Sequence, residues 1–117
     1  MLRNMLKSKI HRATITAIHL DYEGSIACDK ALLRAADILP GEKVLVANLN
    51  NGKRFETYAI TGGKGEISLR GAAARMGHAG DRIIVMAFGL MDDLEARQRK
   101  PLVIRPDKLN RIMTKGK

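Results

Sequence analysis

Turn signals recur about every ten residues along this chain, and this spacing restricts the fold more than any other sequence feature. The most specific signal is Asn51-Gly52, a dipeptide that favours a hairpin turn between the predicted strands 44–49 and 54–61. Parallel strands need long connections, usually helices, and the chain has no long helical segment. The spacing therefore indicates one mainly β domain, a small barrel of about six short strands and not an α/β sheet.

The segments between the turns have strand or short-helix patterns. β-Branched residues concentrate between Ile10 and Leu20, which favours a strand, and the apolar run 83–88 favours a buried one. Asp29 is in position to cap a short helix that ends at Pro40-Gly41. The expected strands are 10–20, 44–49, 54–61, 66–69 and 83–88, and the expected short helices or turns are 31–36, 71–74 and 92–98.

The chain is long enough for one core and too short for two. Its 117 residues, 45% of them hydrophobic, suit a single domain over residues 1–117. Cys28 has no second cysteine to pair with, so we expect it to be buried as a small apolar residue, in a reducing compartment. Residues 1–9 have no continuous apolar run, so we expect a soluble, cytoplasmic protein with no membrane partner.

The net charge of +9 raises the question of a nucleic-acid partner. Most of it is C-terminal, because residues 97–117 carry +7 and residues 1–96 carry +2. We expect residues 106–117 to form a basic, flexible tail. The two Tyr and two Phe residues offer little surface for base stacking, which disfavours nucleic acid. A non-catalytic β-barrel that binds nucleic acid or an acidic partner through this tail is the alternative to an enzyme.

Several common catalytic and metal-binding patterns are absent from the sequence. Ser25 lacks the second glycine of a nucleophile elbow, and residues 62–65 lack the spacing of a phosphate-binding loop. His11, His19 and His78 do not have metal-ligand spacing. The sequence therefore predicts no metal site and no imported cofactor.

The Gly24-Ser25 dipeptide, where a predicted strand breaks into a turn, has two interpretations. It is an ordinary loop dipeptide in the first. In the second, Gly24 holds a backbone conformation barred to other residues, and the Ser25 hydroxyl attacks its carbonyl and converts the amide to an ester. β-Elimination then cuts the chain into residues 1–24 and 25–117 and leaves dehydroalanine, which hydrolysis converts to a pyruvoyl group.

Side chains suited to a ketone-based decarboxylase lie on two predicted strands. Lys9 and His11 share one face, and Arg54 and Tyr58 share a face of the hairpin's second strand. A guanidinium can bind a carboxylate through two hydrogen bonds, and a tyrosine hydroxyl can protonate a carbanion. Thr57 falls on the opposite face, so a bulge or a subunit boundary must intervene if it serves the same site. Each side chain also has an ordinary interpretation, as a surface charge, a satisfied polar group or a core ring.

Seven blocks of this sequence, in order, resemble the pyruvoyl-dependent aspartate 1-decarboxylase family over most of the chain. They are Met5-Leu6, Lys9-Ile10-His11-Arg12, Tyr22-Glu23-Gly24-Ser25, Asn51-Gly52-Lys53-Arg54-Phe55, Thr57-Tyr58-Ala59-Ile60, Gly71-Ala72-Ala73-Ala74 and Gly80-Asp81. The resemblance implies a six-stranded double-psi β-barrel with short helices, and a homotetramer with sites between subunits. It implies autocatalytic cleavage between Gly24 and Ser25, and decarboxylation of L-aspartate to β-alanine and carbon dioxide for pantothenate biosynthesis. It leaves room for a maturation factor as a further partner.

The resemblance also implies roles for individual residues. Ser25 would become the pyruvoyl cofactor, which forms a Schiff base with substrate, and Tyr58 would donate a proton after carbon dioxide leaves. Lys9 and Arg54 would hold substrate carboxylate, and Thr57 would assist cleavage through a hydrogen bond near the Gly24 carbonyl. The remaining residues would shape or line the pocket: His11, Tyr22, Gly71, Ala72 and Ala73.

Arg70 departs from the family pattern, which usually has asparagine before the Gly-Ala-Ala turn. That asparagine helps to position the processing loop, so Arg70 bears on maturation and on the charge of the pocket. A pyruvoyl decarboxylase for another amino acid is therefore a second alternative.

Overall fold

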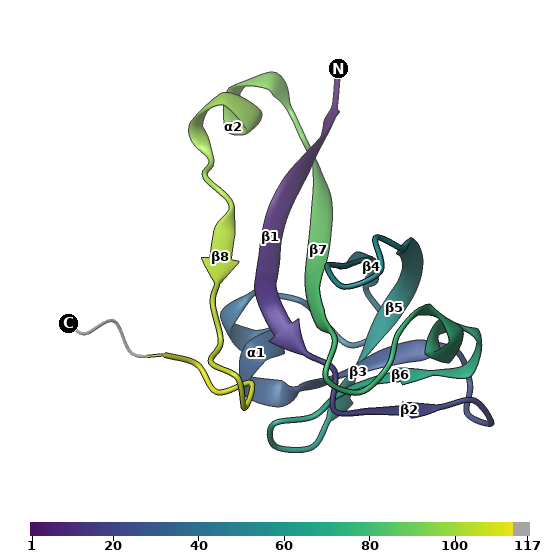
Figure 1. Cartoon of the computed structure of the whole chain (residues 1–117). Coiled ribbons are helices and arrows are strands. Elements are labelled where there is room, and N and C mark those ends of the chain that lie inside the picture. The colour runs from purple at the N-terminus through teal and green to yellow at the C-terminus, as the bar shows by residue number, and fades with distance from the viewer. Residues whose placement is uncertain (114–117) are drawn as a thin grey trace.

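The computed structural model describes residues 1–113, and over this range the chain is mainly β (Figure 1). The strands are β1 (Arg3–Thr14), β2 (Ala17–His19), β3 (Ser25–Asp29), β4 (Lys43–Asn48), β5 (Arg54–Gly62), β6 (Ile67–Arg70), β7 (Arg82–Met91) and β8 (Leu102–Ile104). The helices are α1 (Lys30–Ala35), the 3-10 helix η1 (Gly71–Met76) and α2 (Asp93–Gln98). The predicted mainly β fold with short helices is confirmed. Residues 1–113 contain eight strands where about six were expected, and two of the eight have only three residues.

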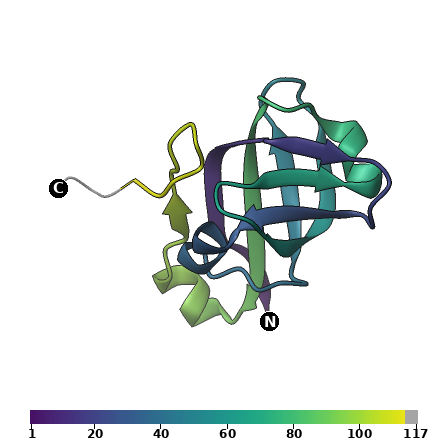
Figure 2. The same ribbon diagram turned by 90° about the horizontal axis from the view of Figure 1, so that it is seen from below.

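The strands form one mixed sheet in the order β2-β6-β3-β5-β4-β7-β1-β8. The sheet turns at β5, because Arg54–Tyr58 pair with β4 and Ala59–Gly62 pair with β3. In Figure 1 and Figure 2, β2, β6 and β3 lie side by side and run across β1 and β7. One group of strands consists of β2, β6 and β3, the other consists of β4, β7 and β1, and β5 continues from one to the other. The two groups therefore enclose a shared interior.

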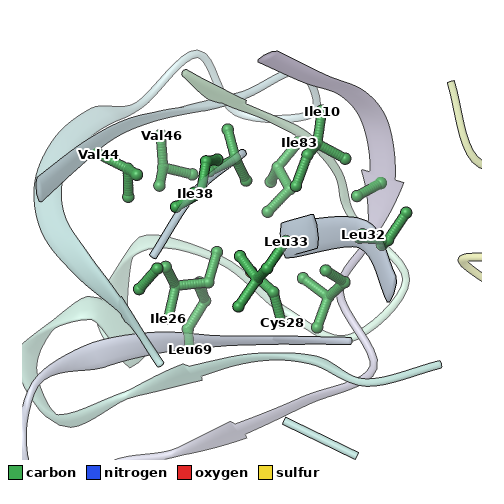
Figure 3. Packing of buried hydrophobic residues seen from close by; sticks show 14 of the residues in the cluster. Ile10, Ile26, Cys28, Leu32, Leu33, Ile38, Val44, Val46, Leu69 and Ile83 are labelled. Carbon is green, nitrogen blue, oxygen red and sulfur yellow. The ribbon is translucent and has the colours of Figure 1, made fainter. Parts of the chain in front are cut away.

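Aliphatic side chains fill this interior (Figure 3). They come from both groups of strands and from α1, and those labelled in the figure include Ile10, Ile26, Leu32, Leu33, Val44, Val46, Leu69 and Ile83. Cys28 lies in the same cluster, and burial raises the pKa of its thiol to about 12. The prediction that Cys28 is a buried apolar residue is confirmed.

The most specific local signals are confirmed. Asn51-Gly52 lies between β4 and β5, which pair antiparallel. The Asp29 side chain accepts a hydrogen bond from the Ala31 amide at 2.7 Å and so caps α1. Both signals act through local backbone geometry and do not depend on the rest of the fold.

The predicted strand over residues 10–20 is wrong in its extent. β1 starts at Arg3 and pairs with β7 as far as Thr14. The Thr16 amide then donates to the Ile67 carbonyl at 2.7 Å, and β2 pairs with β6. The run of β-branched residues therefore serves two groups of strands. β3 was not predicted, because all five of its residues are buried and show no alternation.

Residues 106–113, which we expected to belong to a flexible tail, are attached to the rest of the fold. Asn110 is 1% exposed, and its Nδ2 donates to the carbonyls of Thr14 at 2.8 Å and Gly65 at 3.0 Å. Its Oδ1 accepts from the Thr14 amide at 2.8 Å. These hydrogen bonds anchor the segment to β1 and to the loop before β6. The rest of the predicted tail, residues 114–117, lies outside the described residues.

Neither a membrane span nor a cluster of metal ligands occurs in the described part of the chain. None of the helices within residues 1–113 has the length and apolarity needed to cross a bilayer. Nor do three or more His, Cys, Asp or Glu side chains gather as metal ligands in this range.

Candidate active site

Ser25 is the first residue of β3 and lies between two neighbouring strands. It pairs with Arg70 of β6, and the next residue, Ile26, pairs with Ala59 of β5. Ser25 is 1% exposed, and its Oγ donates a hydrogen bond to the Glu23 carbonyl oxygen at 3.3 Å. The peptide bond before Ser25 therefore joins an exposed turn to a buried strand.

A pocket of about 270 Å³ opens beside Ser25, and it is lined by Tyr22, Glu23, Ser25, Tyr58, Ile60 and Arg70. Its size suits a small molecule, because sites for drug-sized ligands start at about 300 Å³. Five of the six lining residues have polar side chains, which favours a polar one. The pocket brings together three of the predicted site residues, Tyr22, Ser25 and Tyr58. Sequence reasoning missed Ile60, which the two-residue period places on the same face as Tyr58.

Gly71, at the start of η1, packs against the turn that precedes Ser25. It lies in the left-handed region with φ +64°. A Cβ there would be 2.6 Å from the Gly24 nitrogen and 2.7 Å from the Tyr22 carbonyl oxygen. A side chain at this position would displace the backbone of the turn. Gly71 therefore packs closely against the turn and does not line the pocket.

Gly24 does not have the restricted backbone conformation that the second interpretation of the Gly24-Ser25 dipeptide predicts. Its φ lies outside the left-handed region, and a Cβ there would come no closer than 3.8 Å to the Arg70 carbonyl oxygen. That expectation is wrong, since the restricted conformation belongs to Gly71. The Ala72 nitrogen would be 4.0 Å from the same Cβ, so the start of η1 lies close to the turn. Ala73, also in η1, is buried.

The Arg70 side chain is held by Ser68 of β6, by Glu66 just before that strand, and by Tyr22 in the turn before Ser25. Its Nη2 donates to Glu66 Oε2 at 3.1 Å, and its Nε makes a longer contact of 3.5 Å with Ser68 Oγ. Its guanidinium lies 4.9 Å from the centroid of the Tyr22 ring, which stacks on His19. The hydrogen bond from Ser68 is the largest of the causes that lower the pKa of Glu66, so this carboxylate stays charged.

Lys9 and His11 do not reach this pocket within one chain. Both lie on β1, and β7 and β4 separate β1 from β5 in the sheet. His11 Nδ1 is buried and has no hydrogen-bond partner among residues 1–113. Burial lowers the pKa of His11, and the charges of Lys9, Arg105, Arg12 and Arg82 lower it further. Its imidazole is therefore neutral at pH 7.

Arg54 and Thr57 are also outside the pocket. Arg54 is at the exposed start of β5, four residues from Tyr58, which is about 13 Å along a strand. The pairing of β4 with β5 is unbroken from Ala47–Arg54 to Lys43–Tyr58, so no bulge turns Thr57 to the Tyr58 face. Of the two explanations for Thr57, the bulge is wrong and the subunit boundary stays a prediction.

The surroundings of Ser25 fit a pyruvoyl group formed at this position. Such a group would end the chain at residue 25, beside the pocket. Ile26–Asp29 pair with β5, and Ile26–Cys28 pair with β6. The strand would therefore stay held on both sides if the bond before Ser25 were cut.

Fold and pocket together describe a small β domain with an aliphatic core and, beside Ser25, a site for a small polar molecule. The profile of the family described as "Aspartate decarboxylase" matches residues 1–113. The chain belongs to this family of enzymes, whose fold is a double-psi β-barrel, and the resemblance found in the sequence is confirmed.

Three curated relatives illustrate the similarity, and each is named aspartate 1-decarboxylase. The protein of Thermoanaerobacter pseudethanolicus is 55% identical over 113 residues, which cover 95% of this chain and 97% of that protein. The protein of Heliobacterium modesticaldum is 55% identical over 115 residues, covering 97% of this chain and 87% of that protein. The protein of Dehalococcoides mccartyi is 54% identical over 110 residues, covering 92% of this chain and 89% of that protein.

Proposed function

We propose that this chain converts L-aspartate to β-alanine and carbon dioxide with a pyruvoyl group that it makes from its own Ser25. Family membership supports the decarboxylation of aspartate. The observation that carries the rest is the location of Ser25, buried at the start of β3 beside a pocket that also contains Tyr58. The product would enter pantothenate biosynthesis, and the unpaired Cys28 suits a reducing compartment such as the cytoplasm.

Maturation begins when Ser25 Oγ attacks the Gly24 carbonyl carbon and the C–N bond breaks, so that the amide becomes an ester. Loss of the Ser25 α proton then expels Gly24 as a carboxylate and leaves dehydroalanine at position 25. Water hydrolyses this group to a ketone, and the nitrogen leaves as ammonia. The close packing of Gly71 against the turn supports this step, because it holds the reacting backbone in place. Ser25 Oγ bonds to the Glu23 carbonyl, so it rotates about Cα–Cβ before it attacks.

A pyruvoyl group supplies a ketone that condenses with the substrate amine and accepts the electron pair released as carbon dioxide leaves. Tyr58 lines the same pocket and is 38% exposed, so it is accessible to a bound molecule. We assign to its hydroxyl the proton that the substrate carbon receives. Tyr22 and Ile60 bound the pocket and restrict how substrate lies in it.

Four of the predicted residues would come from a neighbouring copy of the chain: Lys9, His11, Arg54 and Thr57. Within one chain, two strands separate β1 from β5, and neither Lys9 nor Arg54 lines the pocket. We therefore propose a homotetramer in which Lys9 and Arg54 of one subunit bind substrate carboxylate at the pocket of the next. Phe88 and Leu90, which are 39% and 67% exposed, give β7 an apolar surface that suits such contacts. Thr57 would assist cleavage, and a maturation factor is a further proposed partner.

Turnover of L-aspartate and L-glutamate by the purified chain tests this proposal. We expect β-alanine and carbon dioxide from aspartate, and no carbon dioxide from glutamate. Ser25→Ala is the control, because it lacks the oxygen needed for the ester. Faster turnover of glutamate would replace the proposed substrate, and an absence of carbon dioxide from both would contradict the activity.

A further inference from the structure

We infer that Arg70 binds the carboxylate that the substrate keeps, which is the side-chain carboxylate of L-aspartate. This inference rests on the proposed function and adds a substrate-binding residue from the same chain as Ser25. The roles implied by the family resemblance do not include it.

The sheet places Arg70 directly opposite Ser25. The two residues pair across the antiparallel strands β3 and β6, so their Cα atoms are about 4.5–5.5 Å apart and their side chains share one face. Within residues 1–113, Arg70 is the one cationic residue that lines the pocket. Glu23, in the exposed turn, is the one acidic residue of the lining. Among the residues of its own chain, Arg70 is therefore the positive charge that a dicarboxylate meets in this pocket.

The Arg70 guanidinium keeps hydrogen-bond donors free for a ligand. Nη2 bonds to Glu66 and Nε contacts Ser68, while Nη1 has no hydrogen-bond partner among the described residues. A guanidinium has five N–H groups in a planar fork, so it can bind a second carboxylate while the first stays in place. The side chain of Arg70 is 24% exposed, which leaves it accessible.

The contacts around Arg70 also fix its orientation. Glu66 holds one edge of the guanidinium, and the Tyr22 ring packs against its face at 4.9 Å. A cation held in this way loses little side-chain freedom when a ligand binds. The guanidinium is therefore oriented before the substrate binds.

The chemistry of decarboxylation decides which carboxylate Arg70 binds. The departing carboxylate gives up its charge as carbon dioxide forms, so a cation bound to it would stabilise the ground state more than the transition state. The other carboxylate keeps its charge throughout the reaction. A cation bound there increases affinity without opposing the chemical step.

Succinate is the probe for this inference, because it carries two carboxylates and no amine and so binds without reacting. We would titrate succinate by calorimetry into the self-cleaved wild-type protein and into Arg70→Gln, Arg70→Lys and Arg75→Gln. Arg75→Gln is the matched control, since Arg75 is exposed in the same short helix that follows Arg70 and does not line the pocket.

We expect Arg70→Gln to weaken succinate binding roughly 10-fold or more, as the loss of a charge-assisted hydrogen bond predicts. Arg70→Lys should weaken binding less, and Arg75→Gln should not change it. The KM for aspartate should rise in parallel while kcat changes little. If Arg70→Gln does not fold, the same measurements on Arg70→Lys decide the question.

Equal succinate affinity in the wild-type protein and in the folded Arg70 variants would overturn the inference. So would failure of both folded Arg70 variants to cleave, because Arg70 would then belong to maturation. Failure of the proposed function is distinguishable, since the wild-type chain itself would then stay uncut or release no β-alanine.

Discussion

Gly71 is the residue whose lack of a side chain matters most for the turn before Ser25, where we propose that the chain is cleaved. Its φ is +64°, and the Gly24 backbone occupies the space that a Cβ would need. The sequence shows a run of small residues here but not which of them touches the turn. The structure assigns that role to Gly71, while Gly24 has room for a methyl group.

Gly71→Ala is expected to reduce both stability and cleavage. The left-handed conformation costs alanine about 1 kcal/mol, and contact with the turn adds roughly 1–3 kcal/mol. Urea unfolding measures the first effect, and the cleaved fraction by intact mass measures the second. Gly80→Ala is the matched control, because Gly80 has φ +95° and no atom within 4 Å of its Cβ position. Equal cleavage by both variants would show that the contact with Gly24 does not matter.

His11 makes the stability of the fold depend on pH. Its folded-state pKa lies below the ordinary value of 6.5, first because of burial and then because of Lys9, Arg105, Arg12 and Arg82. The unfolded chain therefore takes up this proton at a higher pH than the folded chain does. The stability that the neutral His11 imidazole contributes to the fold is fully present above pH 6.5. It is lost as the pH falls through the lower, folded-state pKa.

Unfolding free energies in urea between pH 7.5 and pH 5.5 test this effect. We expect the wild-type protein to lose stability over this range, and His11→Gln to lose less because it has no imidazole to protonate. The carboxyl groups with lowered pKa have ordinary values of 4.5 or less, so they contribute at lower pH. His78→Gln, at an exposed position, is the control and should behave as the wild-type protein does. An unchanged pH dependence in His11→Gln would refute the assignment.

Among the elements, the C-terminal segment that follows β8 is more firmly attached than its charge suggests. The density of basic residues there predicts a flexible tail. The side-chain hydrogen bonds that attach this segment come from the buried Asn110, which bonds to both backbone groups of Thr14 and to the Gly65 carbonyl. Such a contact joins residues far apart in the chain, so composition and local pattern contain no sign of it.

Asn110→Gly should destabilise the protein by about 2 kcal/mol, because buried backbone groups of β1 and of the loop before β6 lose their partners. Glycine is chosen because residue 110 has φ 62°, which glycine adopts without strain. Lys108→Gly, in the same turn but exposed, is the control. Thermal unfolding of the two variants measures the difference, and equal midpoints would show that the Asn110 contacts add nothing.

The difference between contacts among neighbouring residues and contacts among distant ones also explains which elements could be predicted from the sequence. The hairpin at Asn51-Gly52 and the cap at Asp29 depend on neighbouring residues and were predicted. The break between β1 and β2 arises because the chain exchanges β7 for β6 as its partner, and this depends on the whole fold. β3 was missed because burial on both faces removes the alternation that marks a strand.

At the scale of the whole molecule, the candidate site joins parts of the chain that local patterns cannot connect. Ser25 and Tyr58 were predicted, and the structure places both in one pocket. Arg70 was singled out only as a departure from the family pattern, because its place in the pocket follows from its pairing with Ser25 on a strand that was not predicted. Lys9 and Arg54 do not line the pocket in one chain, and we propose that they act from a neighbouring subunit.

Cleavage before Ser25 would not release the first 24 residues from the fold. β1 pairs with β7 from Arg3–Met91 to Thr14–Arg82 and also pairs with β8, while β2 pairs with β6. Both fragments would therefore contribute strands to one sheet. We expect them to elute together in gel filtration under native conditions and to separate only in denaturant.

The intact mass of the purified protein under denaturing conditions tests the central claim most directly. The account predicts two chains, residues 1–24 and residues 25–117, the longer one without a free N-terminal amine. Ser25→Ala should give one chain. A wild-type protein that stays a single chain of 12.9 kDa after prolonged warm incubation, and releases no carbon dioxide from aspartate, would contradict the account.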